Sequence, residues 1–319
     1  MIDIIIPVYR AKKTLDRCLS SIVMQTGCDV SVTLVNDHPS EEDYRDFVER
    51  YSPMIKIVEI QMNPIGIGGA RQMGVDNTSS ELFCFMDADD TLVSSTALAE
   101  LEALMDDDVV VGIGSFEELR PDSKPVIHRG DMIWMFGKMY RRSFWRENKI
   151  TFIPSSCSNE DTGVNAMISL LLDDTHRSAT TDTIVYQWHF NIESLTRQND
   201  CSYTYDQNVT GYAENMVRAI HHVLTVDPGN PHVSRRVMYD ICNLYKMHLE
   251  TVARAPQYTQ HSWSAAKYFY DSCFPQDGIP FDVLREEYDK VMYGDEFPMR
   301  GIIPHITLMD FIASLACSW

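Results

Sequence analysis

The chain contains the apolar stretch Leu82-Phe83-Cys84-Phe85-Met86, which is followed at once by Asp87-Ala88-Asp89-Asp90. A short apolar run that stops at polar residues is typical of a strand buried on both faces of a sheet. In an extended segment residues i and i+2 point the same way, so Asp87 and Asp89 present two carboxylates side by side. The stretch therefore predicts a buried strand with an acidic end.

Strands and helices alternate on both sides of this stretch. Apolar runs predict further strands at 4–6, 30–35, 55–60 and 109–111. Helical spacing and helix-start residues predict helices at 15–23, 44–51, 66–76 and through Leu98, Leu101 and Leu104. This alternation predicts an α/β fold with a Rossmann-like, mostly parallel sheet and helices on both of its faces.

Polar residues follow three of the predicted strands. They are Tyr9-Arg10 after the first strand, Asn36-Asp37 after the second, and the acidic group 87–90 after the fourth. Ligands of such sheets bind beyond the carboxyl ends of the strands. The sequence therefore predicts a ligand site at this edge.

The texture of the chain changes along its length of 319 residues. Residues from about 115 to 200 are mixed and rich in turns, and helical spacing dominates from Tyr203 onward. We therefore predict a catalytic domain at 1–200 and a helical domain at 201–319, which would bind the acceptor or mediate oligomerisation. An amphipathic stretch near the end of the chain is expected to pack on the body of the protein or on a second copy; it contains Leu308, Phe311, Ile312 and Leu315.

Composition excludes several classes of protein. The eight cysteines are scattered without a C-x-x-C pair, which excludes zinc-ribbon and thioredoxin-type sites and favours a reducing compartment. No signal peptide is recognisable, and no run reaches the roughly 18 apolar residues of a membrane helix. We therefore predict a cytoplasmic protein without a transmembrane segment.

The charge balance disfavours non-specific binding to nucleic acid or to anionic membranes. The chain carries 46 acidic and 27 basic side chains, a net charge of −19. The main basic run is predicted to be a solvated helix face, with an acceptor phosphate or a nucleic acid as the sharper alternative; it comprises Lys138, Arg141, Arg142, Arg146 and Lys149.

The acidic group has a specific chemical interpretation. Two adjacent carboxylates repel each other unless they are protonated or bridged by a cation. Mg²⁺ and Mn²⁺ take such oxygen ligands and complete their shell with phosphate oxygens, as in a bound diphosphate. The alternative for a bare D-x-D is a solvated acidic turn that caps the next helix.

Four stretches, in their order and spacing, resemble the inverting, GT-A-fold glycosyltransferases of family 2. They are Ile4 to Tyr9 with the helix after it, Leu34 to Asp37, Asn63 to Gly74, and Phe85 to Asp90. A fifth match is Gly137-Lys138-Met139-Tyr140-Arg141, followed downstream by Asn159-Glu160-Asp161. The resemblance covers roughly residues 1 to 165 and leaves the helical C-terminal third unexplained.

The resemblance implies a nucleotide-sugar site. Pro7, Val8 and Tyr9 would line the nucleoside pocket, and Asp37 would accept a hydrogen bond from the base edge, as a carboxylate can from a pyrimidine imide N–H. The glycines around Gly69 would let the backbone approach phosphate or sugar, and Arg71 would pair with the diphosphate. Alternatively, Tyr9 is a core aromatic, the glycines only make a turn, and Arg71 makes a surface salt bridge.

The resemblance also implies a metal and a base. Asp87 and Ala88 would contact the donor, Asp89 would coordinate Mn²⁺ or Mg²⁺ with help from Asp87, and Asp161 would be the general base. Glu160 is the competitor for that role, and a helix-start carboxylate is the structural alternative. His189 is a candidate third metal ligand, with a hydrogen-bonded structural histidine as the alternative.

The sequence departs from the family pattern at three places. The usual Asn after the first Tyr is Arg10, the D-D-G-S turn reads Asn36-Asp37-His38-Pro39, and the Asn of A-R-N is Gln72. The acidic positions are retained, so an active enzyme is expected. The departures leave the identity of the donor open.

The expected protein is a metal-dependent inverting glycosyltransferase that moves a sugar from a nucleotide-diphosphate sugar, UDP-linked by expectation, to an acceptor hydroxyl. The acceptor would be a surface glycan or, less in keeping with the charge, a hydroxylated DNA base. The alternatives are an inactive nucleotide-sugar-binding module and a nucleotidyltransferase. The latter typically has a glycine- and lysine-rich loop after the first strand, which Pro7 to Ala11 is not.

Overall fold

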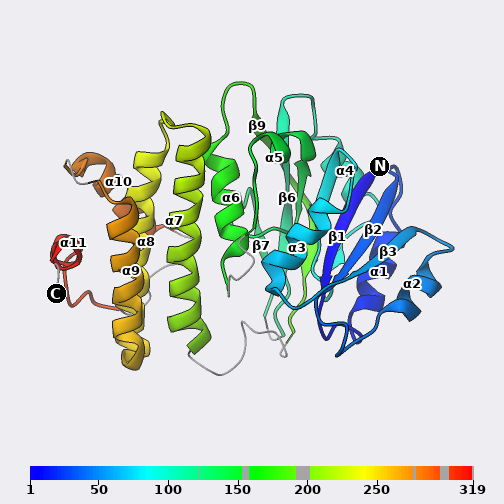
Figure 1. Cartoon of the computed structure of the whole chain (residues 1–319), viewed down its shortest axis with the longest axis horizontal. Helices are drawn as coiled ribbons and strands as arrows, with labels where there is room; N and C mark the ends of the chain where they lie inside the picture. The colour runs from blue at the N-terminus through cyan, green and yellow to red at the C-terminus, as the bar shows by residue number, and fades with distance from the viewer. Residues whose placement is uncertain (122, 153–157, 192–201, 276–277, 295–301, 318–319) are drawn as a thin grey trace. The chain divides into compact units, whose positions relative to one another are not determined.

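A computed structural model of the chain describes residues 1–121, 123–152, 158–191, 202–275, 278–294 and 302–317 (Figure 1). The chain divides into two compact units. The first contains Met1–Ser156 and Leu172–Ile192, and the second contains Cys157–Leu171 and Glu193–Trp319. Residues 157–171 thus belong with the helical C-terminal part, although they precede Leu172 in sequence. The predicted functional division at 200/201 stays a prediction.

The first unit is built on one sheet, with strand order β3-β2-β1-β4-β8-β6-β9-β5 (Figure 1). The strands are β1 (Ile2–Val8), β2 (Val30–Asn36), β3 (Lys56–Gln61), β4 (Leu82–Phe85), β5 (Thr91–Leu92), β6 (Val109–Glu118), β8 (Lys138–Arg141) and β9 (Arg177–Trp188), with β7 (Val126–His128) paired to β6. Strands β3, β2, β1 and β4 are parallel, β8 is antiparallel to both of its neighbours, and β6 pairs in parallel with β9. The predicted α/β fold with a mostly parallel sheet is confirmed.

Helices cover both faces of this sheet. They are α1 (Leu15–Val23), α2 (Arg45–Tyr51), α3 (Gly66–Asp76), α4 (Ala97–Glu102) and α5 (Arg142–Glu147). Alternate residues of β1 point to opposite faces: Ile4 and Ile6 join a core with α1, α2 and α4, whereas Ile5 points at α3. A Cβ on Gly74 of α3 would lie 2.2 Å from Ile5 Cγ2, so only glycine permits this close approach of helix and strand.

The basic run at 138–149 is not the solvated helix face predicted from the sequence. Lys138 and Arg142 are each only 1% exposed. Lys138 Nζ donates to the carbonyl of Trp134 at 2.6 Å, and Arg142 donates to the carbonyls of Val75 and Ser80 at 2.7 and 2.6 Å. These cations are buried anchors of the first unit, while Arg146 and Lys149 are exposed.

The second unit is helical, as predicted for the C-terminal region. Its α-helices are α6 (Glu160–Leu170), α7 (Asn208–Val226), α8 (Val233–Arg254), α9 (Thr259–Cys273), α10 (Phe281–Tyr293) and α11 (Leu308–Ala316), with a π-turn at Tyr203–Gln207 and a 3₁₀ turn at Pro256–Tyr258. In α11 the apolar stretch noted in the sequence is buried within this unit, as expected for packing on the body. Among the described residues, no helix has the length and hydropathy needed to cross a membrane.

Candidate active site

The candidate site lies at the carboxyl edge of three neighbouring parallel strands of the first unit. Val8 at the end of β1 pairs with Asn36 at the end of β2, and Phe85 at the end of β4 pairs with Ile5 of β1. Tyr9, Asp37 and Asp87 follow these strand ends directly or within two residues. The polar residues that the sequence placed after three separate strands therefore meet at one edge of the sheet.

The acidic group 87–90 is held by the end of β9. Asp90 is fully buried, and it accepts hydrogen bonds from the Tyr186 hydroxyl at 2.7 Å and from the His189 backbone N–H at 2.8 Å. Tyr186 Oη in turn accepts the backbone N–H of Asp87 at 3.1 Å. One tyrosine hydroxyl thus ties the first and last acids of the group together.

Burial and mutual repulsion disfavour the charged forms of Asp89 and Asp90 in this group. Burial, with the neighbouring charges of Asp87 and Asp89, raises the pKa of Asp90 well above its usual range. Burial and the charge of Asp87 also raise the pKa of Asp89, although Asn191 Nδ2 donates to Asp89 Oδ2 at 2.9 Å. A set of hard oxygen donors that favours added positive charge fits Mg²⁺ or Mn²⁺.

The side chains that the structure describes do not complete a metal shell here. The described residues contain no group of three or more His, Cys, Asp or Glu side chains arranged to hold a metal ion. His189 Nε2 lies 2.8 Å from Thr91 Oγ1, and burial lowers the pKa of His189. This contact is of the kind expected for a structural histidine, and its role as a metal ligand stays a prediction.

Arg71 lies beside the acidic group. Its guanidinium is buried on α3, and its Nη2 donates to Asp87 Oδ1 at 2.9 Å, so the ion pair is internal rather than on the surface. Ala88 is also buried. Gly69 lies two residues before Arg71 in α3, where a Cβ would come within 2.4 Å of Ile65 Cγ1. This packing accounts for the glycine, and its donor contact stays a prediction.

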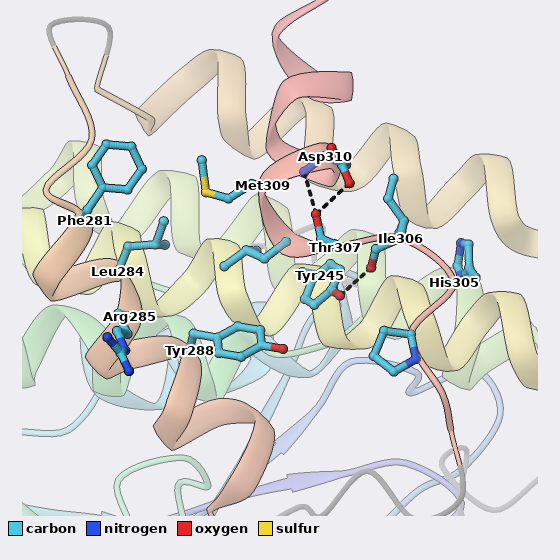
Figure 2. A pocket seen from close by; sticks show the side chains of 12 residues that line it. Tyr245, Phe281, Leu284, Arg285, Tyr288, His305, Ile306, Thr307, Met309 and Asp310 are labelled. Carbon is cyan, nitrogen blue, oxygen red and sulfur yellow. Dashed lines mark hydrogen bonds between the residues drawn. The ribbon is translucent and has the colours of Figure 1, made fainter.

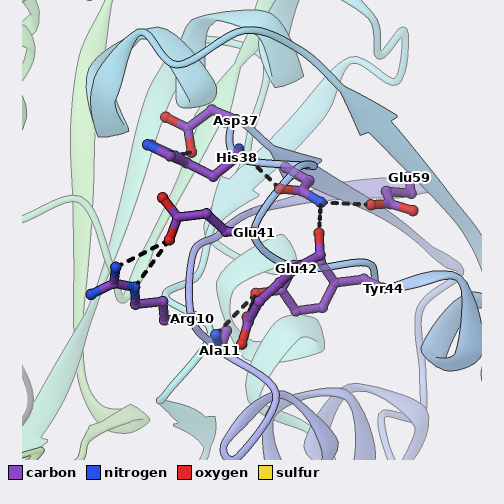
Figure 3. Close-up of polar contacts among 9 residues, drawn as sticks. Arg10, Ala11, Asp37, His38, Glu41, Glu42, Tyr44 and Glu59 are labelled. Atoms are coloured by element: carbon purple, nitrogen blue, oxygen red, sulfur yellow. Dashed lines mark hydrogen bonds and ion pairs between the residues drawn. The ribbon is translucent and has the colours of Figure 1, made fainter.

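Figure 3 shows the loops after β1 and β2, where the sequence predicts the nucleoside pocket. Asp37 is 6% exposed, and its Oδ1 lies 2.9 Å from His38 Nδ1. The His38 ring contacts the Tyr9 ring at 4.4 Å between centroids, and Arg10 pairs with Glu41 at 3.1 Å. Tyr9 is 43% exposed, so it is not a core aromatic, while Val8 is buried and Pro7 partly so.

The two candidate bases belong to the second unit, at the start of α6. The helix begins after Asn159, whose φ of 59° is left-handed. Asp161 Oδ1 accepts the Thr162 backbone N–H at 2.7 Å, and the Asp161 side chain is partly exposed, whereas Glu160 is 7% exposed. The more accessible carboxylate is thus the one that the sequence favoured, and its role stays a prediction.

Sequence reasoning missed three residues that organise the site. Asp90 was included in the motif without a role, and neither Tyr186 nor Asn191 was predicted to belong to the site. The hydrogen bonds from Tyr186 and Asn191 to the acidic group bridge 96 and 102 residues of sequence. The one local signal for them is that polar residues follow apolar Val185 at the end of β9.

Comparisons with known proteins identify glycosyltransferases as relatives of this chain. The family model described as "Glycosyl transferase family 2" matches residues 3–159. A poly(ribitol-phosphate) beta-glucosyltransferase of Bacillus spizizenii is 24% identical over 239 residues, 69% of this chain and 36% of that protein. The matches span between 16% and 36% of the length of the first three curated relatives.

Two solved structures share the fold. TarS 1–349 of S. aureus in complex with UDP-GlcNAc matches with a TM-score of 0.69 at 16% identity, covering 91% of this chain and 88% of that one. A mannosyltransferase from Pyrobaculum calidifontis, in complex with GDP-Man and Mn²⁺, matches with a TM-score of 0.51 at 14% identity, covering 92% and 88%. At these identities the likeness shows the fold alone.

Proposed function

From a chain whose residues 3–159 belong to glycosyl transferase family 2, we propose a metal-dependent, inverting enzyme that transfers a sugar from a UDP-sugar to an acceptor hydroxyl. One observation carries the proposal. A buried carboxylate, Asp37, lies beyond β2, and a pair of repelling carboxylates, Asp87 and Asp89, lies beyond β4; both strands are parallel neighbours of β1 in one sheet.

The diphosphate end of the donor would lie at the acidic group. Asp89, with Asp87, would hold Mn²⁺ or Mg²⁺, and donor phosphate oxygens would supply the ligands that the described residues lack. The metal would neutralise the charge that develops on the departing UDP. Arg71 already neutralises one oxygen of Asp87, so it lowers the cost of holding two carboxylates side by side.

The UDP part of the proposal rests on two supports. Asp37 can accept the imide N–H of uracil, and the TarS structure with the higher TM-score was solved with UDP-GlcNAc. Tyr9, exposed in the loop after β1, offers an aromatic face for the base.

Inversion needs a base that removes the proton of the acceptor hydroxyl as it attacks the anomeric carbon from behind. Asp161 is our candidate, since its carboxylate is partly exposed while Glu160 is buried.

For the acceptor we propose a hydroxyl of a surface glycan or of a polyol-phosphate polymer. The support is the relative that is named for poly(ribitol phosphate). The hydroxylated DNA base considered from the sequence loses its physical support, because the basic run that would bind DNA includes the buried Lys138 and Arg142.

The test is release of UDP from UDP-glucose and from UDP-GlcNAc by the full chain, with excess Mn²⁺ or with EDTA. We expect slow hydrolysis that depends on the metal and that Asp89→Asn lowers by about 10²-fold or more. The matched control is Asp173→Asn, which changes an exposed aspartate on a loop of the same unit and should leave hydrolysis unchanged. Full activity in EDTA would overturn the metal part of the proposal.

A further inference from the structure

Asp37 offers only half of its carboxylate to a ligand. Its side chain is 8% exposed, and Oδ1 is occupied by His38 Nδ1 at 2.9 Å. Because a carboxylate can only accept, the proton of this hydrogen bond is on Nδ1. Oδ2 receives no hydrogen bond from any residue that the structure describes, and Figure 3 shows it turned away from His38. Oδ2 is not fully buried, so a donor of a ligand or of water can reach it.

His38 is itself fixed from two sides. Its backbone N–H donates to Asn36 Oδ1 at 3.0 Å, and Asn36 Nδ2 donates to the carbonyl of Glu42 at 2.8 Å and to Glu59 Oε1 at 3.0 Å (Figure 3). Its ring lies against Tyr9, 4.4 Å away and tilted by 45°. Asn36 is 1% exposed, so the turn that carries the histidine is anchored in the sheet. The hydrogen bond to Asp37 therefore belongs to a turn whose conformation is fixed by the contacts of Asn36 and Tyr9.

The number of free carboxylate oxygens discriminates between nucleobases. Uracil presents one imide N–H, flanked by carbonyl acceptors, and needs one oxygen. Guanine presents two adjacent donors, the ring N–H and the exocyclic amine, which pair best with both oxygens of a free carboxylate. An Asp37 whose Oδ1 is occupied satisfies uracil fully and leaves one guanine donor without a well-placed acceptor.

We propose that His38 is a specificity-determining residue, which selects a uracil nucleotide over a guanine nucleotide by occupying one oxygen of Asp37. The inference rests on the proposed function and specifies which nucleotide its site selects. The shared fold cannot make this choice, since the two matching structures carry UDP-GlcNAc and GDP-Man. His38 also stands where the sequence departs from the usual D-D-G-S turn.

The test is calorimetric titration of the full chain with UDP and with GDP in the presence of Mn²⁺, which gives the ratio of the two Kd values. His38→Leu keeps a similar volume and removes the donor, so it should lower the preference for UDP by about tenfold, the worth of one hydrogen bond to a charged group. His38→Asn places its amide nitrogen at the position of Nδ1 and should keep the wild-type ratio. His176→Leu is the matched control, because His176 Nδ1 also lies beside an aspartate, 3.2 Å from Asp173 Oδ1.

The outcomes separate this inference from the proposed function. An unchanged UDP-to-GDP ratio in His38→Leu, with UDP still bound, overturns the role of His38 and leaves the proposed function standing. A wild-type protein that prefers GDP overturns the inference as well. A wild-type protein that binds neither nucleotide contradicts the proposed function itself. Near-ultraviolet circular dichroism of each variant confirms that the turn variants are folded, as expected for a side chain that is 27% exposed.

Discussion

At the scale of single residues, the acidic group depends on a tyrosine. The Tyr186 hydroxyl donates to Asp90 Oδ2 and accepts the Asp87 N–H, and both Tyr186 and Asp90 are buried. Tyr186→Phe leaves one oxygen of a buried carboxylate without its donor. We expect a loss of about 1–3 kcal/mol in the free energy of unfolding and a weaker binding of Mn²⁺, measured by denaturant titration and by the EPR signal of free Mn²⁺.

A matched tyrosine separates these two effects. Tyr212 is buried in the second unit and donates to the buried Asp240 at 2.7 Å. Tyr212→Phe should destabilise the protein by a similar amount and leave Mn²⁺ binding unchanged. Equal losses of Mn²⁺ affinity in both variants would show that Tyr186 acts only through overall stability.

The two neighbouring carboxylates of α6 should behave differently. Asp161→Asn removes the proposed base, so we expect kcat for sugar transfer to fall by about 10²–10⁴-fold while the Kd for UDP stays unchanged. Glu160→Gln should retain most of the transfer. Single-turnover kinetics measures transfer by both variants, and circular dichroism checks that both are folded. A larger loss in Glu160→Gln than in Asp161→Asn would assign the base to Glu160.

The residues that sequence reasoning found and missed differ in a physical way. Asp37, Asp87 and Asp89 were predictable because each comes within four residues of the end of an apolar strand, so local pattern alone places it at the edge of the sheet. Tyr186 was not predictable, because a tyrosine inside a strand has the same pattern whether its hydroxyl faces solvent or a buried carboxylate. That distinction is made by a partner 96 residues away.

At the scale of elements, the junction of β8 and α5 shows why a run of basic residues is a poor guide to a binding surface. Arg142, the first residue of α5, is buried and pairs with Asp3 of β1 at 3.2 Å. The sequence could not reveal this, because Asp3 and Arg142 lie 139 residues apart. The cation joins the first strand to the helix that follows β8.

This assignment predicts a contrast between two arginines of the same helix. Arg142→Met leaves the buried Asp3 without its cation and should cost about 3–5 kcal/mol of unfolding free energy. Arg146→Met, at an exposed position one turn later, should change it by no more than about 0.5 kcal/mol. Urea titration checks both, and similar effects for the two variants would show that Arg142 does not anchor the fold.

The helices of the second unit contain a pH-sensitive contact. His248 of α8 is buried and lies 2.9 Å from Ser262 Oγ of α9, and burial, with a smaller effect of His305, lowers the pKa of His248 to about 4. Between this value and the ordinary 6.5 the unfolded chain binds more protons than the folded one. The contribution of His248 to the free energy of unfolding is therefore fully present above pH 6.5. It is lost as the pH drops towards 4, by about 3 kcal/mol in all.

The check is denaturant titration at several pH values. His248→Gln should remove the part of the pH slope between 6.5 and 4 that this group contributes, while His232→Gln, at an exposed position, should keep the wild-type slope. An identical slope in His248→Gln and wild type would contradict a neutral, buried His248.

At the scale of the whole molecule, the sequence predicted the parallel half of the sheet better than the rest. The four strands β3, β2, β1 and β4 alternate with helices, and their bounds match the predicted runs within two residues. The antiparallel insertion of β8 between β4 and β6 was not predicted. Its four residues pair with strands that lie far away in sequence, so local periodicity carries no information about their order.

The division of the chain into units has a similar cause. Helix α6 packs with α7 in the second unit, although β9 of the first unit follows α6 in sequence. A boundary drawn where the composition changes cannot detect a helix that leaves its sequence neighbours. The candidate base at 161 and the candidate metal site at 89 consequently belong to different units.

The central claim is that one edge of the sheet binds a uracil nucleotide and a divalent cation together. The most direct measurement is the Kd of UDP by calorimetry, with Mn²⁺ and with EDTA, for the wild-type chain and for Asp89→Asn. We predict that EDTA weakens UDP binding by at least about tenfold, and that Asp89→Asn gives the same weak affinity with Mn²⁺ as the wild type gives without it. An affinity for UDP that neither EDTA nor Asp89→Asn changes would contradict the claim.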